Sequence, residues 1–252
     1  MNTGLFVALD VPNAVDAMAL VQRVQGAVVP DGVQLGYKVG MELFYREGLS
    51  FVRQLQQQCD GPVFLDVKLH DIPNTVYRTA RNLASCGVRF FNVHASGGKD
   101  MMEAAATGAR EGAKEAGISW DEMSVIAVTI LTSTSQAVLE KEMKVTHSLP
   151  DQVAHLAGLA QTSGLHGVVC SAQEASMLTA SLGADFLKVT PGIRLKNQQG
   201  GDDQVRVMTP ERAIQSGATH LVVGRPITQA DHPSKAAEFV MNEMAGGVNA
   251  AS

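Results

Sequence analysis

Residues 5–12, LFVALDVP, are the stretch that separates the two folds open to this chain. Residues 5–9 form an unbroken apolar run, which is typical of a parallel strand covered on both faces. In a doubly wound nucleotide-binding sheet, the first strand leads into a Gly-x-Gly-x-x-Gly turn. Here Asp10, Val11 and Pro12 follow instead, so the sequence favours a closed barrel over an open sheet.

Seven more apolar runs follow, and the segments between them carry apolar residues three and four apart, as amphipathic helices do. Pro12-Asn13 and Thr209-Pro210 are start signals for helices. Eight strand–helix units predict an α/β protein, a single (β/α)8 TIM barrel over residues 1–252, with a frayed tail from about residue 245 to 252. The seven runs are residues 33–39, 63–69, 89–93, 124–131, 167–170, 185–189 and 219–223.

The composition argues against several classes of partner. Lys and Arg number 20 against 25 Asp and Glu, a net charge of −5, so the basic excess of a nucleic-acid binder is missing. The longest apolar runs fall far short of the about 20 residues of a membrane span, and no signal peptide is recognisable. Three widely separated cysteines predict no disulfide framework, so we expect a cytoplasmic protein without a membrane partner.

Charged side chains stand at the carboxyl ends of the first three predicted strands: Asp10, then Lys38, then Asp66 and Lys68, with Asp71 just beyond. In a barrel these ends meet at one mouth, where active sites lie. Asp66 and Lys68 are two residues apart and share a face. Alone, they could be a buried ion pair that only satisfies itself, but Asp10 and Lys38 at the same mouth favour a catalytic site.

The alternation of charge also constrains the chemistry. Lys38, Asp66, Lys68 and Asp71 sum to zero, and each carboxylate favours the ammonium form of a neighbouring lysine. A protonated lysine is a poor nucleophile, which disfavours imine formation at Lys68. It is a good proton donor and electrostatic clamp, and we expect that role for Lys68.

Two glycine–arginine turns follow the last two predicted strands, the usual phosphate-binding position in a barrel. They are residues 191–194, with Pro191 and Arg194, and residues 223–225, with Gly224 and Arg225. Glycine lets backbone N–H groups approach an anion, and arginine offers a forked contact to phosphate oxygens. The two turns together predict a phosphorylated ligand.

Two connections, residues 132–150 and 195–207, are too long for simple turns, and long loops in compact domains are often functional. The first begins with Thr132. The second is polar and contains glycine, which fits either a disordered surface loop or a lid whose Gln204 reaches back over the phosphate.

The histidines and cysteines show no metal-ligand spacing, so no metal site is expected. His94, on the fourth predicted strand, is more consistent with a polar core residue than with a ligand or base. His70 is expected to point outward.

Residues 66–75, DVKLHDIPNT, resemble the signature of the orotidine 5′-phosphate decarboxylase family. The resemblance extends over nearly the whole chain, and the length and spacing are similar to the short, monofunctional bacterial members. The other matching blocks are residues 8–10, Lys38, and residues 131–133, 190–194, 201–204 and 223–225.

The resemblance implies conversion of orotidine 5′-monophosphate to UMP and CO2, the last step of de novo pyrimidine nucleotide synthesis, with no metal and no organic cofactor. It also implies a homodimer with sites at the interface, in which Asp71 and the region of Thr75 are donated to the partner's site.

By the same resemblance, Asp10 and Lys38 contact the ribose hydroxyls and Thr132 the amide edge of the pyrimidine. Lys38, Asp66, Lys68 and Asp71 form the catalytic network. The remaining substrate contacts that the resemblance implies are Ile72, Thr75, Pro191, Arg194, Gln204, Gly224 and Arg225.

In this chemistry, protonated Lys68 stabilises the carbanion at C6 and then delivers the proton. Asp66 either destabilises the substrate carboxylate or positions Lys68, and both readings stay open. One rival is a Mg²⁺-dependent sugar-phosphate decarboxylase or hexulose-phosphate synthase. Residues 72–75 and Gln204 argue against it. A second rival, a non-catalytic nucleotide-phosphate sensor, has no need for a buried Lys68.

Overall fold

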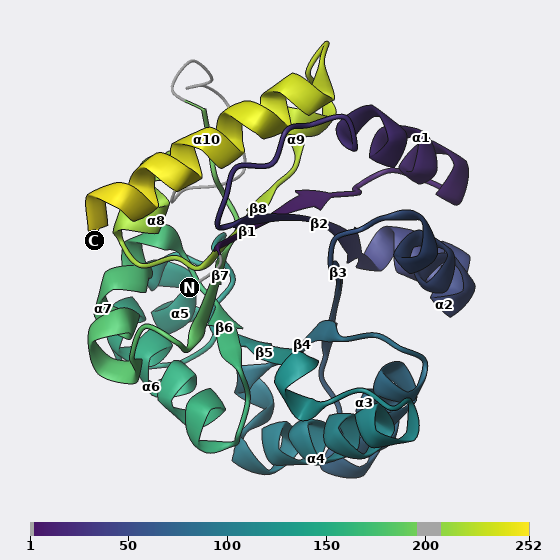
Figure 1. Ribbon diagram of the computed structural model, residues 1–252. Helices are drawn as coiled ribbons and strands as arrows, with labels where there is room; N and C mark the ends of the chain where they lie inside the picture. Colours follow the sequence, from purple (N-terminus) through teal and green to yellow (C-terminus); the bar gives the residue numbers. More distant parts are fainter. Residues whose placement is uncertain (1–2, 196–207, 252) are drawn as a thin grey trace.

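The structure is a computed structural model that describes residues 3–195 and 208–251, and it is a closed ring of parallel strands surrounded by helices (Figure 1). Each strand pairs with the next along the chain, and β8 pairs back with β1. The predicted single (β/α)8 barrel is confirmed. The strands are β1 (Thr3–Ala8), β2 (Val33–Gly40), β3 (Val63–Leu69), β4 (Phe90–His94), β5 (Ser124–Val128), β6 (Gly167–Val169), β7 (Leu187–Thr190) and β8 (His220–Val223).

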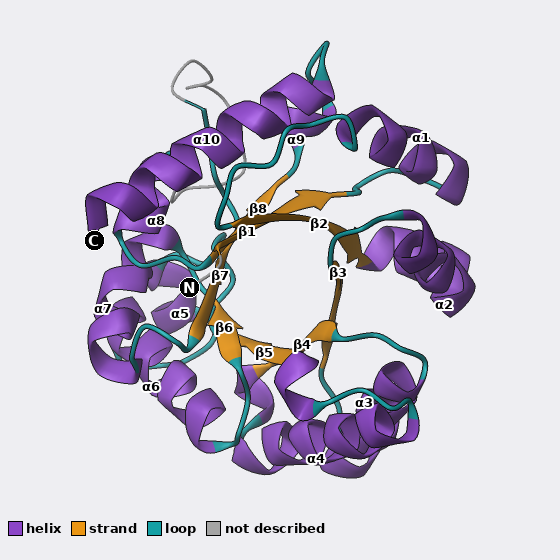
Figure 2. Ribbon diagram, in the orientation of Figure 1, coloured by secondary structure: helices purple, strands orange, loops and turns teal. Residues whose placement is uncertain are grey.

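The helices lie on the outside of the strand ring (Figure 2). Asn13 caps the first of them by accepting the N–H of Asp16, and the Thr209 side chain caps α8. The helices are α1 (Ala14–Val24), α2 (Met41–Gln58), α3 (Pro73–Ser85), α4 (Lys99–Glu115), α5 (Gln136–Lys141), α6 (Leu149–Thr162), α7 (Ala172–Leu182), α8 (Pro210–Gln215), α9 (Arg225–Thr228) and α10 (Pro233–Ala251), with short 3-10 turns η1 (Ala95–Gly97) and η2 (Trp120–Glu122).

Two segments differ from expectation. The connection over residues 132–150 contains α5, which the Ser135 side chain caps, so it is not a plain loop. Residues 245–251 continue α10, where the sequence analysis expects a frayed tail. The helix continues because Ala245 and Val248 pack against the core on the same side as Met241 and Met244.

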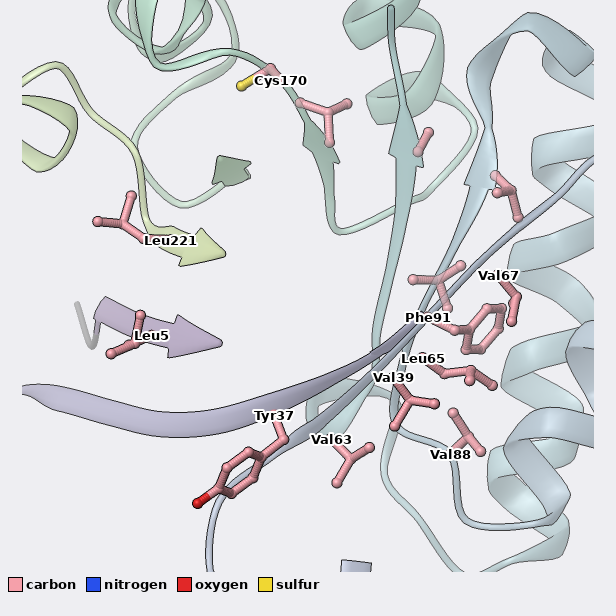
Figure 3. Close-up of a cluster of buried hydrophobic side chains, with 14 of the residues drawn as sticks. Leu5, Tyr37, Val39, Val63, Leu65, Val67, Val88, Phe91, Cys170 and Leu221 are labelled. Atoms are coloured by element: carbon pink, nitrogen blue, oxygen red, sulfur yellow. The ribbon is translucent and has the colours of Figure 1, made fainter. Parts of the chain in front are cut away.

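Strand alternation divides the core into two parts. Outward side chains such as Leu65 and Val67 pack against the helices (Figure 3). Inward side chains fill the barrel, where the ring centroid of Phe6 lies 5.4 Å from that of Phe64 and 5.1 Å from that of Phe90. This apolar layer closes the barrel below the carboxyl ends of the strands, so a polar residue further along the inward face of a strand projects into the mouth.

Helices α3 and α4 pack unusually close to one another. A Cβ atom at Gly108 of α4 would lie 2.2 Å from the carbonyl oxygen of Tyr77 on α3, so only glycine fits there. The contact is extended by an ion pair between Arg81 and Glu115. Because α3 begins two residues after Asp71, close packing of α3 against α4 fixes the helix to which the Asp71 segment is joined.

Candidate active site

A cavity of about 330 Å³ opens at the carboxyl ends of the strands and contains most of the predicted site residues. A larger cavity of about 730 Å³ lies at the opposite end, where Val63, Phe90, Ser124 and His220 begin their strands, and contains none of them. Barrel enzymes act at the carboxyl end, so the smaller cavity is the candidate site. Predicted residues that line it are Asp10, Lys38, Asp66, Lys68, Thr132, Pro191, Arg194, Gly224 and Arg225.

One side of this cavity is a continuous chain of charges from the first three strands. Asp10 Oδ1 lies 3.0 Å from Lys38 Nζ, which lies 3.6 Å from Asp66 Oδ2. Asp66 Oδ1 in turn accepts a hydrogen bond from Lys68 Nζ at 2.6 Å. The four residues lie together at the mouth of the barrel, as the sequence predicts, and each charge lies beside one of opposite sign.

The pKa of Asp66 reflects its position in the middle of this chain. Burial alone raises the pKa of the carboxyl, but the charges of Lys38 and Lys68 and the hydrogen bonds from Lys68 and Asn92 outweigh it, so the net shift is downward. Asp66 is therefore ionised at neutral pH, as a partner for two ammonium groups must be.

Asn92 on β4 is a site residue that the sequence analysis missed. Its side chain is fully buried, accepts the backbone N–H of Lys68 at 2.7 Å and donates to Asp66 Oδ1 at 2.7 Å. The signal was present in the sequence. Asn92 interrupts the apolar run of residues 89–93 at a position two residues from Phe90, which faces the barrel interior.

Lys68 reaches this position through an irregularity in β3. Between the pairs Leu65–Phe91 and Leu69–Val93, β3 advances four residues while β4 advances two. Within this bulge Lys68 has a φ of 52°, a left-handed conformation that is uncommon for a residue with a side chain. The bulge turns Lys68 toward Asp66, and such strain is characteristic of functional sites.

The other side of the cavity is formed by the loops after β7 and β8. Residues 191–194 and Gly224 with Arg225 line it together, as the sequence predicts, and α9 and the residue after it add Thr228 and Gln229, which were not predicted. Gly192 has a φ of 81°, which glycine adopts without strain. Gln204 lies outside the described residues.

Thr132 lines the cavity between these two sides, from the loop after β5. Apolar side chains beside it come from the same strand and loop, Val128, Ile130 and Leu131. This part of the cavity is therefore lined mainly by apolar side chains, with the Thr132 hydroxyl among them.

Asp71, Ile72 and Thr75 are the predicted residues that do not line this cavity. All three are exposed at the start of α3, and the Asp71 carboxylate accepts the N–H of Ile72 at 2.7 Å. Ile72 is 66% exposed, which is unusual for a large apolar side chain.

His94 and His70 lie beside the charged chain, with ring centroids 5.4 Å apart. Burial, and then the charges of His70 and Lys68, lower the pKa of His94, so its ring is neutral at pH 7. His70 is exposed. Within residues 3–195 and 208–251, three or more His, Cys, Asp or Glu side chains are nowhere grouped as metal ligands, and no helix has the length and hydropathy of a membrane span.

Functional side chains at the carboxyl ends of parallel barrel strands are the mark of a (β/α)8-barrel enzyme, and this chain is of that class. Sequence comparison identifies the particular family. The profile of the "Orotidine 5'-phosphate decarboxylase / HUMPS family" matches residues 3–240. The chain belongs to this family.

Individual relatives agree with this assignment. An orotidine 5′-phosphate decarboxylase of Bacillus cereus is 45% identical over 246 residues, 98% of this chain and 99% of the relative. One of Bacillus anthracis is 44% identical over the same length. The crystal structure of the enzyme from Lactobacillus acidophilus superimposes with a TM-score of 0.82 at 40% identity, over 96% of this chain and 99% of that one. These relatives are carboxy-lyases by name, and the chain is a member of their enzyme family.

Proposed function

We propose that this protein decarboxylates orotidine 5′-monophosphate to UMP and CO2, the last step of de novo pyrimidine nucleotide synthesis, in the cytoplasm. The observation that carries the proposal is the cavity itself. One side holds Lys68 at 2.6 Å from ionised Asp66, and the other presents Arg194 and Arg225 on glycine-containing loops. A nucleotide monophosphate offers a reactive base to the first side and a phosphate to the second.

The reaction follows from the charges. Cleavage of the C6–carboxylate bond releases CO2 and leaves the electron pair on C6, where no adjacent group delocalises it. The ammonium group of Lys68 stabilises this developing charge and then transfers its proton to C6, which yields UMP. No metal or organic cofactor takes part in this scheme.

Asp66 supports Lys68 in this scheme by holding its ammonium group 2.6 Å away. A substrate carboxylate beside the ionised Asp66 is also repelled, and that repulsion is relieved when CO2 leaves. Both effects act in the same direction, toward loss of CO2.

The opposite side of the cavity supplies binding energy. Arg194 and Arg225 are suited to a phosphate dianion through charge-assisted hydrogen bonds, and Gln204 is assigned to the same clamp. Binding energy at the phosphate is available to the chemical step as well as to binding. Asp10 and Lys38 are assigned to the ribose hydroxyls, and Thr132 to the pyrimidine amide edge.

The active form is proposed to be a homodimer in which Asp71, Ile72 and Thr75 reach the partner's cavity. Their exposure in the single chain supports this, because they contribute nothing to the cavity of their own chain. Large exposed apolar side chains lie in the segments after β2, β3 and β5 and offer apolar surface to such an interface: Met41, Tyr45, Ile72, Leu131 and Met143.

The experiment follows the absorbance of orotidine 5′-monophosphate with purified protein in EDTA, and compares the wild type with Lys68→Ala. We expect decay with the wild type and a rate at least about 1,000-fold lower with Lys68→Ala, while UMP still binds. Near-normal turnover by Lys68→Ala contradicts the proton-donor role. Absence of decay with the wild type, with UMP still bound, supports a sensor or, if Mg²⁺ and a sugar phosphate restore activity, the metal-dependent branch.

A further inference from the structure

Asn92 is a fully buried polar side chain in the middle of β4, between two apolar neighbours. Both ends of its carboxamide are used by the charged chain. Its oxygen accepts the N–H of Lys68 at 2.7 Å, and its nitrogen donates to Asp66 Oδ1 at 2.7 Å. We infer that Asn92 is a positioning residue that holds Asp66 and Lys68 in their reactive arrangement, an inference that rests on the proposed function.

The first task of Asn92 concerns the backbone of Lys68. A φ of 52° at a residue with a side chain is strained and persists only where neighbouring groups hold it. In the β3 bulge the N–H of Lys68 leaves the regular ladder to β4, because the register there skips from Leu65 to Leu69. The carboxamide oxygen of Asn92 takes the place of the missing ladder acceptor.

The second task concerns the orientation of Asp66. Asp66 Oδ1 receives both Asn92 Nδ2 and Lys68 Nζ, whereas Oδ2 faces Lys38 at the longer distance of 3.6 Å. Without the donor on β4, the carboxylate is free to turn toward Lys38, which Asp10 already shares. Lys68 would then lose the contact that fixes its ammonium group, and the proton would no longer be aimed at one point.

Asparagine suits both tasks because it has a donor and an acceptor at the same distance from the backbone. Leucine has nearly the same shape but offers neither group. Aspartate keeps the acceptor for the Lys68 N–H but places a second carboxylate beside Asp66. The two substitutions therefore separate loss of both contacts from loss of the donor alone.

The pair Asn92→Asp and Asn92→Leu gives the test, with kcat, KM and the UMP dissociation constant measured between pH 5.5 and 8.5. At neutral pH we expect kcat to fall about 100-fold in both variants, since a misplacement of this size in a reactive group has about that effect. KM and UMP binding should stay within about threefold, because the phosphate loops are untouched.

The pH profile distinguishes positioning from simple damage. Two adjacent carboxylates share a proton as pH falls, and a protonated carboxyl on β4 donates to Asp66 as the carboxamide does. Relative to the wild type, kcat of Asn92→Asp should therefore recover toward low pH, and kcat of Asn92→Leu should not. The other ionisable groups near Asp66 are Lys38 on β2, Lys68 on β3 and His94 on β4. Asp10 contacts Lys38 in turn. All of these groups are the same in both variants.

Thr129→Val is the matched control. Thr129 is a buried polar residue just after β5 whose hydroxyl donates to the Val169 carbonyl oxygen at 3.0 Å rather than to a residue of the charged chain. Its kcat should be that of the wild type, and an equal loss there would assign the effect to barrel packing and overturn the inference. If Asn92→Leu does not fold, the pH profile of Asn92→Asp decides alone.

The outcomes for the two proposals are distinct. A wild-type protein without decarboxylase activity defeats the proposed function and the inference with it. An active wild type with kcat of both Asn92 variants within about threefold of its value overturns the inference alone.

Discussion

The two sides of the cavity are built on opposite principles. On the side of β1–β4 every charge has a partner within the chain, and Asp10, Lys38, Asp66 and Lys68 are linked by contacts of 2.6–3.6 Å before any substrate arrives. On the side of β7 and β8, the charged residues among the described lining are Arg194 and Arg225, which stand on glycine-containing loops after the strands. A preorganised array of charges stabilises a transition state without rearrangement, whereas arginines on loops are suited to binding an anion through charge-assisted hydrogen bonds.

This difference predicts which kinetic constant depends on each side of the cavity. Damage to the charged chain should appear in kcat, because the role proposed for this array is to stabilise the transition state. Damage to the arginine side should appear mainly in KM. The predictions below test this division from the charged side outward.

The largest effect is expected from Asp66→Asn. The change leaves Lys38 and Lys68 without the carboxylate between them, so their mutual repulsion moves Lys68 away from C6. We expect kcat to fall at least about 1,000-fold, with UMP binding changed less than tenfold. Steady-state assays and calorimetric titration with UMP measure the two quantities. A parallel loss of UMP binding would break the division between the two sides.

Ile72→Asp tests whether the charged side is completed by a second chain. A carboxylate at this exposed apolar position should weaken the proposed dimer at least about tenfold, since central apolar contacts dominate interfaces. Specific activity should then fall on dilution and recover at high protein concentration, which sedimentation and activity measured together can follow.

Val15→Asp is the control for this change, because Val15 is 78% exposed on α1, on another part of the barrel. Its activity should not depend on concentration more than that of the wild type. If Ile72→Asp is equally inactive at every concentration, Ile72 acts within a site rather than through assembly.

The predictability of the fold and the site differs along the same division. The strands were predictable because parallel strands covered on both faces have continuous apolar runs, and the observed bounds lie within a few residues of those runs. The charged residues were predictable because strand ends converge in any barrel. Asn92 was missed because one polar residue in a short apolar run does not by itself indicate a site. Its importance depends on its contacts with Asp66 and Lys68 on the adjacent strand, which the sequence does not show.

Other features could not be derived from pattern. The β3 bulge depends on register between two strands, which spacing along one strand does not contain. The positions of Asp71 and Thr75 were implied by resemblance, and a single chain only shows that they do not line its own cavity. Gln204 stays a prediction, since it lies outside the described residues.

Arg225→Ala should have a smaller effect than Asp66→Asn, and the effect should be on substrate binding rather than on kcat. Loss of charge-assisted hydrogen bonds to phosphate costs about 1.5–3 kcal/mol, which lowers kcat/KM about 10- to 150-fold. Most of the loss should lie in KM. A second assay measures decarboxylation of orotidine, the nucleoside without the phosphate, in the presence of added phosphite dianion. If Arg225 binds the phosphate, phosphite should activate the wild type more than Arg225→Ala. An unchanged kcat/KM would show that Arg225 does not bind the phosphate.

The smallest effect on kcat is expected far from both sides, at the opposite end of the barrel, where a substitution should change stability instead. The ring of His220 is stacked on Phe6, with centroids 5.6 Å apart, and burial lowers its pKa to about 4. Below pH 6.5 His220 is protonated in the unfolded chain but stays neutral in the folded chain until the pH reaches about 4. The free energy of unfolding therefore falls between pH 6.5 and about 4, by up to about 3 kcal/mol. His220→Phe should remove this part of the pH dependence in denaturant unfolding.

The slope, rather than the absolute stability, is the decisive quantity for His220. The phenylalanine also loses the contact of Nδ1 with the Thr219 hydroxyl at 3.0 Å, but that loss is the same wherever the histidine ring is neutral. His155→Phe, on the exposed face of α6, should keep the wild-type slope. Because His220 is remote from the cavity at the carboxyl ends, kcat of His220→Phe at pH 7.5 should equal that of the wild type. A changed kcat would mean that the apolar layer of the barrel transmits strain to the charged chain, and the site would then depend on the packing beneath it as well as on its own ion pairs.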